Sequence, residues 1–252
     1  MGILNLTPDS FSDGGEHFSK ESALAHAIYL IECGADIIDI GGESSRPGAD
    51  PVSEEEEIER VVDVINDLAP MIGVPISIDT AKPRVAELAL RAGALIVNDI
   101  SGLRNDGMID VAVAYNAPAV IVHMHGAPKT FGTDTMKGDA LAEIKRFLTE
   151  RAEYAVERGM EERNIIVDPG IGFGKTPEQD MSILMNSGWF SDTHPVLIGP
   201  SRKRFLSHYY SGVDEDDATA AVSVAAAENG AGILRVHNVS KLALFLGRGT
   251  GL

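Results

Sequence analysis

The sequence has little cysteine, few basic residues and no long apolar run, and each shortage excludes a class of protein. Cys33 is the single cysteine among 252 residues, which excludes an internal disulfide and a cysteine metal site and favours a reducing compartment. Lys and Arg number 21 against 38 Asp and Glu, a net charge of -17, which argues against nucleic acid or an anionic membrane as partner. With no apolar stretch of about 18 residues and no signal-peptide pattern, we expect no membrane association and a cytoplasmic protein.

What the sequence does contain is a strict alternation of short apolar runs and segments with helical periodicity. Strands are predicted at 2–5, 37–41, 76–79, 95–99, 119–124, 165–168, 196–199 and 233–237. Helices are predicted at 20–33, 53–69, 82–92, 108–115, 139–159, 177–186, 216–229 and 240–246. Such alternation predicts a parallel sheet with helices outside it, and eight repeats are the number that closes a barrel.

We therefore expect an α/β protein in which residues 1–252 form one domain, a (β/α)8 TIM barrel. Its N- and C-terminal ends are expected to be shortened, because the first strand begins at residue 2 and the last helix is brief. A doubly wound open sheet is the structural alternative, since periodicity does not distinguish a closed sheet from an open one.

Polar side chains stand at or just after the carboxyl end of every predicted strand, the face at which such barrels bind ligands. The positions are Asn5, Asp39, Asp79, Asn98, Asp99, His123, His125, Asp168, Ser201, Arg202, Lys203, Arg235 and His237. Carboxylates accept hydrogen bonds and amides both donate and accept, which suits a ring edge rich in N–H donors, such as a guanine or a pterin. Arg46, Lys203, Arg235 and His237 suit phosphate or carboxylate oxygens, so an anionic ligand is expected.

Three other motifs have a structural interpretation that competes with a functional one. Residues 169–176 resemble a phosphate-binding P-loop, but Pro169 stands where that pattern requires glycine. His123 and His125 lie two apart on a predicted strand and could share a metal, although no third soft ligand is evident. The acids after Ser53 and those in 214–217 are typical of helix N-termini, which favours a capping role.

Taken in order along the chain, several of these segments resemble the dihydropteroate synthases. The matching segments are 5–15, 38–48, 78–80, 97–100, 168–175, 201–203 and 235–237. The resemblance runs from residue 1 to about 246 and implies a barrel that joins 6-hydroxymethyl-7,8-dihydropterin diphosphate to p-aminobenzoate. The implied products are diphosphate and 7,8-dihydropteroate, in folate synthesis. The resemblance further implies Mg²⁺ as cofactor and a homodimer as assembly.

The resemblance also implies a role for each candidate residue. The implied pterin ligands are Asp79, Asn98, Asp168, Lys203 and Arg235. The implied diphosphate ligands are Ser45, Arg235 and His237. The implied p-aminobenzoate pocket consists of Phe11, Ser12, Arg46, Pro47, Ser201 and Lys203, with the segments around Phe11 and Arg46 closing over the site. Asn5 is the implied Mg²⁺ ligand. The implied catalytic residues are Lys203, Arg235, His237 and Asp13.

Two alternatives keep the pterin and change the activity. One is the pterin-binding barrel of a corrinoid-dependent methyltransferase, which would need no p-aminobenzoate pocket, so segments 7–15 and 201–203 argue against it. The other is a catalytically silent homologue that binds a pterin or a partner protein, against which the intact site residues argue. No Ser-His-Asp or Cys-His arrangement is evident, so the chemistry requires no covalent enzyme intermediate.

Overall fold

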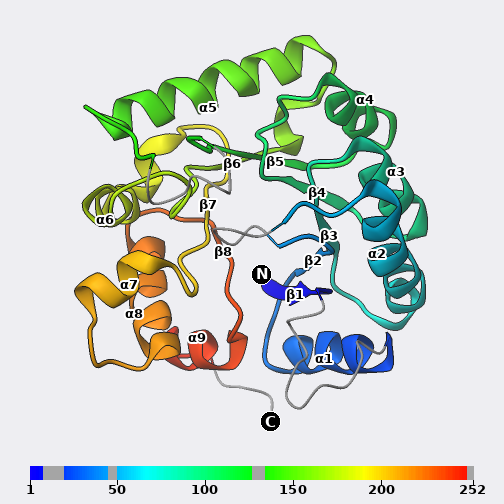
Figure 1. The fold of residues 1–252 in the computed structure, drawn as a ribbon, viewed down its shortest axis with the longest axis horizontal. Coiled ribbons are helices and arrows are strands. Elements are labelled where there is room, and N and C mark those ends of the chain that lie inside the picture. Colours follow the sequence, from blue (N-terminus) through cyan, green and yellow to red (C-terminus); the bar gives the residue numbers. More distant parts are fainter. Residues whose placement is uncertain (8–19, 45–49, 127–133, 249–252) are drawn as a thin grey trace.

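The structure is a computed structural model that describes residues 1–7, 20–44, 50–126 and 134–248, with short strands at the centre and helices in a ring around them (Figure 1). The strands are β1 (Gly2–Asn5), β2 (Ile38–Gly41), β3 (Ile76–Asp79), β4 (Ile96–Asp99), β5 (Ala119–Val122), β6 (Ile165–Asp168), β7 (Leu197–Ile198) and β8 (Ile233–Leu234). All eight predicted strands are confirmed, although β5, β7 and β8 are two or three residues shorter than expected, and β2 and β4 are one residue shorter.

The helices also follow the predicted order. They are α1 (Lys20–Glu32), α2 (Glu54–Leu68), α3 (Pro83–Ala92), α4 (Asp106–Ala114), α5 (Ala140–Glu157), α6 (Pro177–Met185), α7 (Arg204–Tyr209), α8 (Glu215–Glu228) and α9 (Val239–Phe245), with short 3₁₀ turns η2 (Ala69–Met71), η4 (Glu162–Asn164) and η5 (Ser187–Phe190). The short α7 was not predicted, because six residues are too few to display a helical period. None of the helices in these described segments combines the length and apolar composition of a membrane span.

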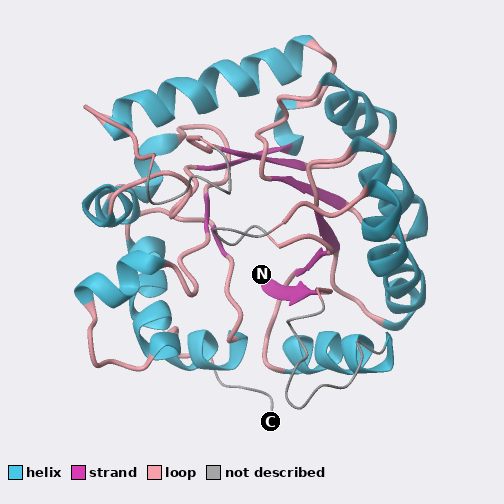
Figure 2. Cartoon of the chain, in the orientation of Figure 1, coloured by secondary structure: helices cyan, strands magenta, loops and turns pink. Residues whose placement is uncertain are grey.

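The strands close into a parallel barrel (Figure 2). β1 to β6 pair in chain order in one sheet, and β7 pairs with β8 in a second. Parallel bridges between Val167 and Val196 and between Gly2 and Val236 join the two sheets at both edges. Across the second seam, Ile3 N donates to the carbonyl of Val236 over 3.0 Å. The closed-barrel prediction is confirmed, and the open-sheet alternative is wrong.

Apolar side chains fill two layers, one between strands and helices and one inside the barrel. On β2, Ile38 and Ile40 pack into the outer layer, which directs the intervening Asp39 inward, because successive side chains of a strand point to opposite faces. On β5, Val120 and Val122 belong to the inner layer. The barrel interior is therefore apolar along β5, and the inward-facing polar residues gather at the carboxyl ends.

Asp99 at the end of β4 is turned away from the barrel mouth and into its own loop. Its carboxylate accepts hydrogen bonds from Ser101 N at 2.7 Å, Ser101 Oγ at 2.8 Å and Leu103 N at 3.0 Å. It is fully buried, and burial raises its pKa, while these donors oppose the rise. The expectation that Asp99 is a cavity residue is therefore corrected: this carboxylate shapes the loop between β4 and α4.

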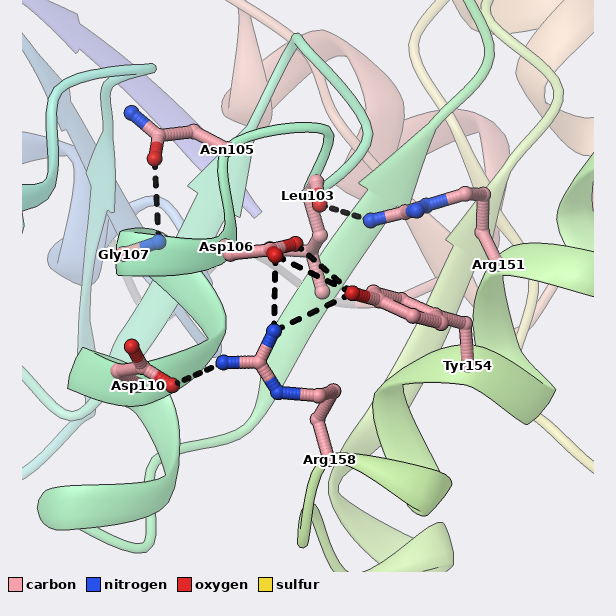
Figure 3. Close-up of polar contacts among 8 residues, drawn as sticks. All are labelled: Leu103, Asn105, Asp106, Gly107, Asp110, Arg151, Tyr154 and Arg158. Carbon is pink, nitrogen blue, oxygen red and sulfur yellow. Dashed lines mark hydrogen bonds and ion pairs between the residues drawn. The ribbon is translucent and has the colours of Figure 1, made fainter.

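Helix α5 holds the same loop from its outer side (Figure 3). Arg151 on α5 donates to the carbonyls of Gly102, over 3.3 Å, and Leu103. Two turns further along, at the C-terminal end of α5, Arg158 forms ion pairs of 2.8 Å with both Asp106 and Asp110 of α4. The loop is fixed on one side by a strand-end carboxylate and on the other by a guanidinium from the helix that follows β5.

Replacing the loop clamp should destabilise the protein more than replacing an exposed arginine of the same helix. Arg151→Met leaves two carbonyls without their charged donor and should lower the free energy of unfolding by about 1–3 kcal/mol. Arg146→Met removes only an exposed pair with Glu150 and should change it by about 0.5 kcal/mol or less. Urea unfolding of both variants measures the difference, and equal losses would contradict the clamp.

Candidate active site

A cavity of about 600 Å³ opens at the carboxyl ends of the strands, a size typical of small-molecule sites. Six of the predicted site residues line it: Asn5, Asp79, Ser201, Lys203, Arg235 and His237. They come from β1, β3, the loop after β7 and the segment at β8. Six others fall outside the described residues: Phe11, Ser12, Asp13, Ser45, Arg46 and Pro47.

The guanidinium of Arg235 ties together carboxylates from two other strands. Its Nε lies 2.6 Å from Asp39 Oδ2, and its Nη2 lies 2.6 Å from Asp79 Oδ2. Asn98 donates its amide to the same Asp39 oxygen over 3.1 Å. Asp39 is fully buried, and a buried carboxylate is costly unless it is paired and hydrogen-bonded. The predicted pterin ligands Asp79, Asn98 and Arg235 therefore form one connected cluster, with Asp39 as its hub.

Burial shifts the proton affinity of two carboxyl groups: that of Asp79, which lines the cavity, and that of Asp168 at the end of β6, which is buried and is not among the lining residues. It raises the pKa of Asp79 to about 7, with the charge of Asp39 adding to the rise and that of Arg235 opposing it. It raises the pKa of Asp168 to about 6, opposed by a 2.7 Å hydrogen bond from Gly170 N and by Lys175. Near neutral pH, Asp168 is mainly an acceptor, whereas Asp79 exchanges between donor and acceptor. The pair suits a heterocyclic edge carrying both N–H groups and acceptors.

Lys203 lies on the cavity wall beside an aromatic ring. Its Nζ is 3.9 Å from the centroid of the Phe173 ring, a cation–π distance. Burial lowers the pKa of Lys203 to about 8, and Arg235 lowers it further, while Asp168 opposes the shift. At neutral pH the lysine is mostly an ammonium held at the barrel mouth, where a cation suits an anionic ligand.

His237 links the cavity lining from β1 to the loop after β7. Its Nδ1 is 2.9 Å from Ser201 Oγ, and its Nε2 is 3.5 Å from Asn5 Nδ2. These side chains supply an imidazole, a hydroxyl and an amide at one edge of the cavity. In the described residues no group of three or more His, Cys, Asp or Glu could hold a metal. The amide oxygen of Asn5 nevertheless fits Mg²⁺, which prefers oxygen ligands and completes its shell with water and phosphate oxygens.

The segment 169–176, here called the glycine loop, does not act as a P-loop. Lys175 Nζ donates to the carbonyls of Gly170 at 2.7 Å and His123 at 2.9 Å, and lies 2.9 Å from His123 Nδ1. The lysine therefore fastens the loop to the end of β5 instead of reaching a phosphate. Gly170 has a φ of 71°, and a Cβ there would lie 1.9 Å from the His123 carbonyl oxygen, so only glycine fits.

The histidine pair likewise has a structural explanation. His123 is buried with its Nδ1 against Lys175, and burial lowers its pKa to about 2, so the ring is neutral. His125 is partly exposed and lies 3.5 Å from Asp134. The two rings therefore have separate partners, which gives no support to the metal-pair interpretation.

The structure adds a cavity residue that the strand-end argument missed. Asp180 lies on α6, lines the cavity, and accepts a 2.7 Å hydrogen bond from Gly172 N. Thr176 caps that helix by accepting from Gln179 N, and Thr176 and Pro177 also line the cavity. The sequence feature that could have indicated Asp180 is an acidic residue four positions after the helix cap. Acidic residues are common near helix N-termini, however, because they interact favourably with the helix dipole.

Comparisons with known proteins point to one family. A family model described as pterin binding enzyme matches residues 1–237. The dihydropteroate synthase of Bacillus subtilis is 46% identical over 247 residues, covering 96% of this chain and 84% of that protein. The solved structure of Xanthomonas albilineans dihydropteroate synthase with 4-aminobenzoic acid matches with a TM-score of 0.91 at 41% identity, covering 98% of this chain and 90% of that one. The structure of the same enzyme with 7,8-dihydropteroate matches with a TM-score of 0.88 at 38% identity, covering the same shares.

Asp168→Asn should change how stability depends on pH. Between pH 4 and 6 the folded wild type keeps a proton on Asp168 that the unfolded chain has lost, because the folded pKa is the higher one. Wild-type stability should therefore fall relative to Asp168→Asn by roughly 2 kcal/mol as pH rises from 4.5 to 7.5, and then level off. The asparagine keeps an acceptor for Gly170 N.

Urea unfolding at pH 4.5, 6 and 7.5 measures this change. Asp192→Asn is the control, because the Asp192 side chain is 87% exposed. Its free energy of unfolding should depend on pH in the same way as that of the wild type. A constant difference between wild type and Asp168→Asn across the pH range would show that the burial of Asp168 does not govern its ionisation.

Proposed function

The chain belongs to the pterin-binding enzymes, and within them to the dihydropteroate synthases, and from that premise we propose how its residues carry the reaction. It is a transferase of folate biosynthesis that condenses 6-hydroxymethyl-7,8-dihydropterin diphosphate with p-aminobenzoate, giving 7,8-dihydropteroate and diphosphate. The observation that carries the residue roles is the convergence of Asp79, Lys203, Arg235 and His237 on one cavity.

The pterin binds against the carboxylate cluster. Asp168 accepts hydrogen bonds from its N–H edge, and Asp79 donates or accepts as the ring requires, since burial places its pKa at about 7. Asn98 is oriented for the ring by its bond to Asp39. Lys203 contacts the ring from the side of Phe173. Buried partners of this kind discriminate strongly, because a ligand lacking the matching groups leaves them unpaired.

The reaction replaces a carbon–oxygen bond by a carbon–nitrogen bond. The methylene–oxygen bond breaks with its electron pair going to the diphosphate, and the amine nitrogen of p-aminobenzoate forms the new bond and then loses a proton. The electron-rich pterin carries the developing positive charge, while Arg235 and His237 hold the departing diphosphate oxygens. The two carboxylates engage Nε and Nη2 of Arg235, which leaves Nη1 to donate to the ligand within the described site.

Asn5 is proposed as the protein ligand of Mg²⁺. Its amide lies beside His237, on the side of the cavity assigned to the diphosphate. When bound, the ion would neutralise negative charge on the leaving diphosphate. Asn5 would hold the ion through its amide oxygen, and its side chain adjoins His237, which in turn contacts Ser201.

The remaining assignments rest on the family resemblance. Phe11, Ser12, Arg46 and Pro47 are proposed for the p-aminobenzoate pocket together with Ser201 and Lys203. Ser45 is proposed for the diphosphate and Asp13 for catalysis. On the same ground we propose that the protein is a cytoplasmic homodimer.

Diphosphate release with and without the amine separates this function from its alternatives. Purified protein with the pterin diphosphate and Mg²⁺ should release diphosphate only when p-aminobenzoate is added. Asp168→Asn should raise the pterin-substrate Michaelis constant by about 30-fold, equivalent to about 2 kcal/mol of lost hydrogen bonding. Release without the amine would indicate a hydrolase, and no release under either condition would indicate one of the two alternatives, the methyltransferase barrel or the catalytically silent homologue.

Metal removal tests the role of Asn5. A chelator should abolish turnover and added Mg²⁺ should restore it. Asn5→Ala should raise the Mg²⁺ concentration for half-maximal activity by about tenfold, through loss of one oxygen ligand. Asn66→Ala, at an exposed position of α2, is the control and should leave that concentration unchanged. Full turnover in chelator, or identical metal curves for the two variants, would remove Asn5 from the metal site.

A further inference from the structure

We propose that Asp180 is a positioning residue that holds Lys203 in place for the pterin substrate, acting through the backbone of the glycine loop at Gly172. The inference rests on the proposed function of this cavity and deepens it. It assigns a role to a side chain on α6, an element outside the strand ends that supply most of the other site residues.

The first step is the anchor between helix and loop. Asp180 is 3% exposed, and its Oδ1 accepts from Gly172 N over 2.7 Å. A buried carboxylate accepting a backbone N–H makes a charge-assisted hydrogen bond, which is stronger than a neutral one. The Asp180 carboxylate therefore fixes the middle of the glycine loop relative to α6.

The second step is the contact between loop and lysine. Gly172 has a φ of 80°, and a Cβ there would lie 2.8 Å from Lys203 Cδ. The lysine stem thus packs directly against the bare backbone of this glycine. The adjacent Phe173 supports the ammonium, whose nitrogen is 3.9 Å from the ring centroid. Two consecutive residues of the anchored loop therefore support the stem and the head of Lys203.

The third step is electrostatic. The charged groups around Lys203 include Arg235 from β8, Asp168 from β6, Asp79 from β3, Asp180 from α6 and Lys175 of the glycine loop, which also interacts with Asp180. Burial and Arg235 lower the lysine pKa, and the three carboxylates oppose that fall. Burial raises the pKa of Asp180 to about 6, so it is mainly ionised at neutral pH and favours the charged lysine. Of the three carboxylates, Asp180 alone is not assigned to the pterin.

Asp180→Asn separates the charge from the anchor. The amide oxygen still accepts from Gly172 N, so the loop stays in place, while the negative charge is removed. The basic limb of the kcat/KM profile for the pterin substrate, between pH 6 and 9, should move to lower pH by about half a unit or more. Glu178→Gln removes one charge from an exposed position of the same helix and should leave the limb where the wild type has it.

A pair of glycine variants tests the contact independently. Gly172→Ala places a methyl group against Lys203 and should lower kcat/KM at least about tenfold. Gly212→Ala imposes a similar backbone strain, with a φ of 84°, but its Cβ would meet no atom within 4 Å. Its kcat/KM should stay within about twofold of the wild type. Thermal unfolding of both variants measures the shared cost of the strain.

The outcomes distinguish this inference from the function on which it rests. A wild type that does not turn over would overturn the function. An active wild type with superimposed profiles for Asp180→Asn and Glu178→Gln, or with equal activity in the two glycine variants, would overturn the positioning role alone. If Asp180→Asn does not fold, the glycine pair decides the question.

Discussion

The ion pairs of Arg235 are the interaction on which the barrel mouth depends. One guanidinium at the end of β8 binds Asp39 of β2 and Asp79 of β3, each over 2.6 Å. β8 pairs with β7, and its segment reaches β1 through the bridge between Gly2 and Val236. The side-chain contacts of Arg235 therefore reinforce the junction between β8 and β1, where few backbone pairings close the barrel. Without the guanidinium, the fully buried Asp39 and the partly buried Asp79 would both lose their charged donor, which is strongly unfavourable.

The same constraint sets the chemistry of the cavity. Burial raises the pKa of the Asp79 carboxyl group and lowers the pKa of the Lys203 ammonium group. Small changes in contact therefore decide which of these groups are charged. Asp79 and Lys203, with pKa values of about 7 and 8, both titrate near neutral pH for this reason. A ligand with N–H donors can hydrogen-bond to the carboxylates of the cavity, and negatively charged oxygens on the same ligand can pair with its cations. The dihydropterin diphosphate has these features.

The local sequence pattern predicted most of the fold. It also predicted about half of the side-chain roles in the described part of the site. Strand positions followed from apolar runs, and closure followed from counting them, because each repeat is a local signal. The expectation for Asp99 was wrong because strand-end position does not say which way a final side chain turns. The hub role of Asp39 was not predictable, since its partner Arg235 lies 196 residues away and no local spacing encodes that pair. Asp180 was missed because it belongs to a helix, where an acid near the N-terminus has a simpler explanation.

A double-mutant cycle between Asp39 and Arg235 tests most directly whether one cluster holds the barrel mouth together. Asp39→Asn, Arg235→Met and the double variant are compared with the wild type by urea unfolding at pH 7.5. Each single variant should be strongly destabilised, and the double variant should recover stability relative to their sum, with a coupling free energy of at least about 2 kcal/mol. A coupling near zero would contradict the dependence of this barrel on the Arg235 ion pairs.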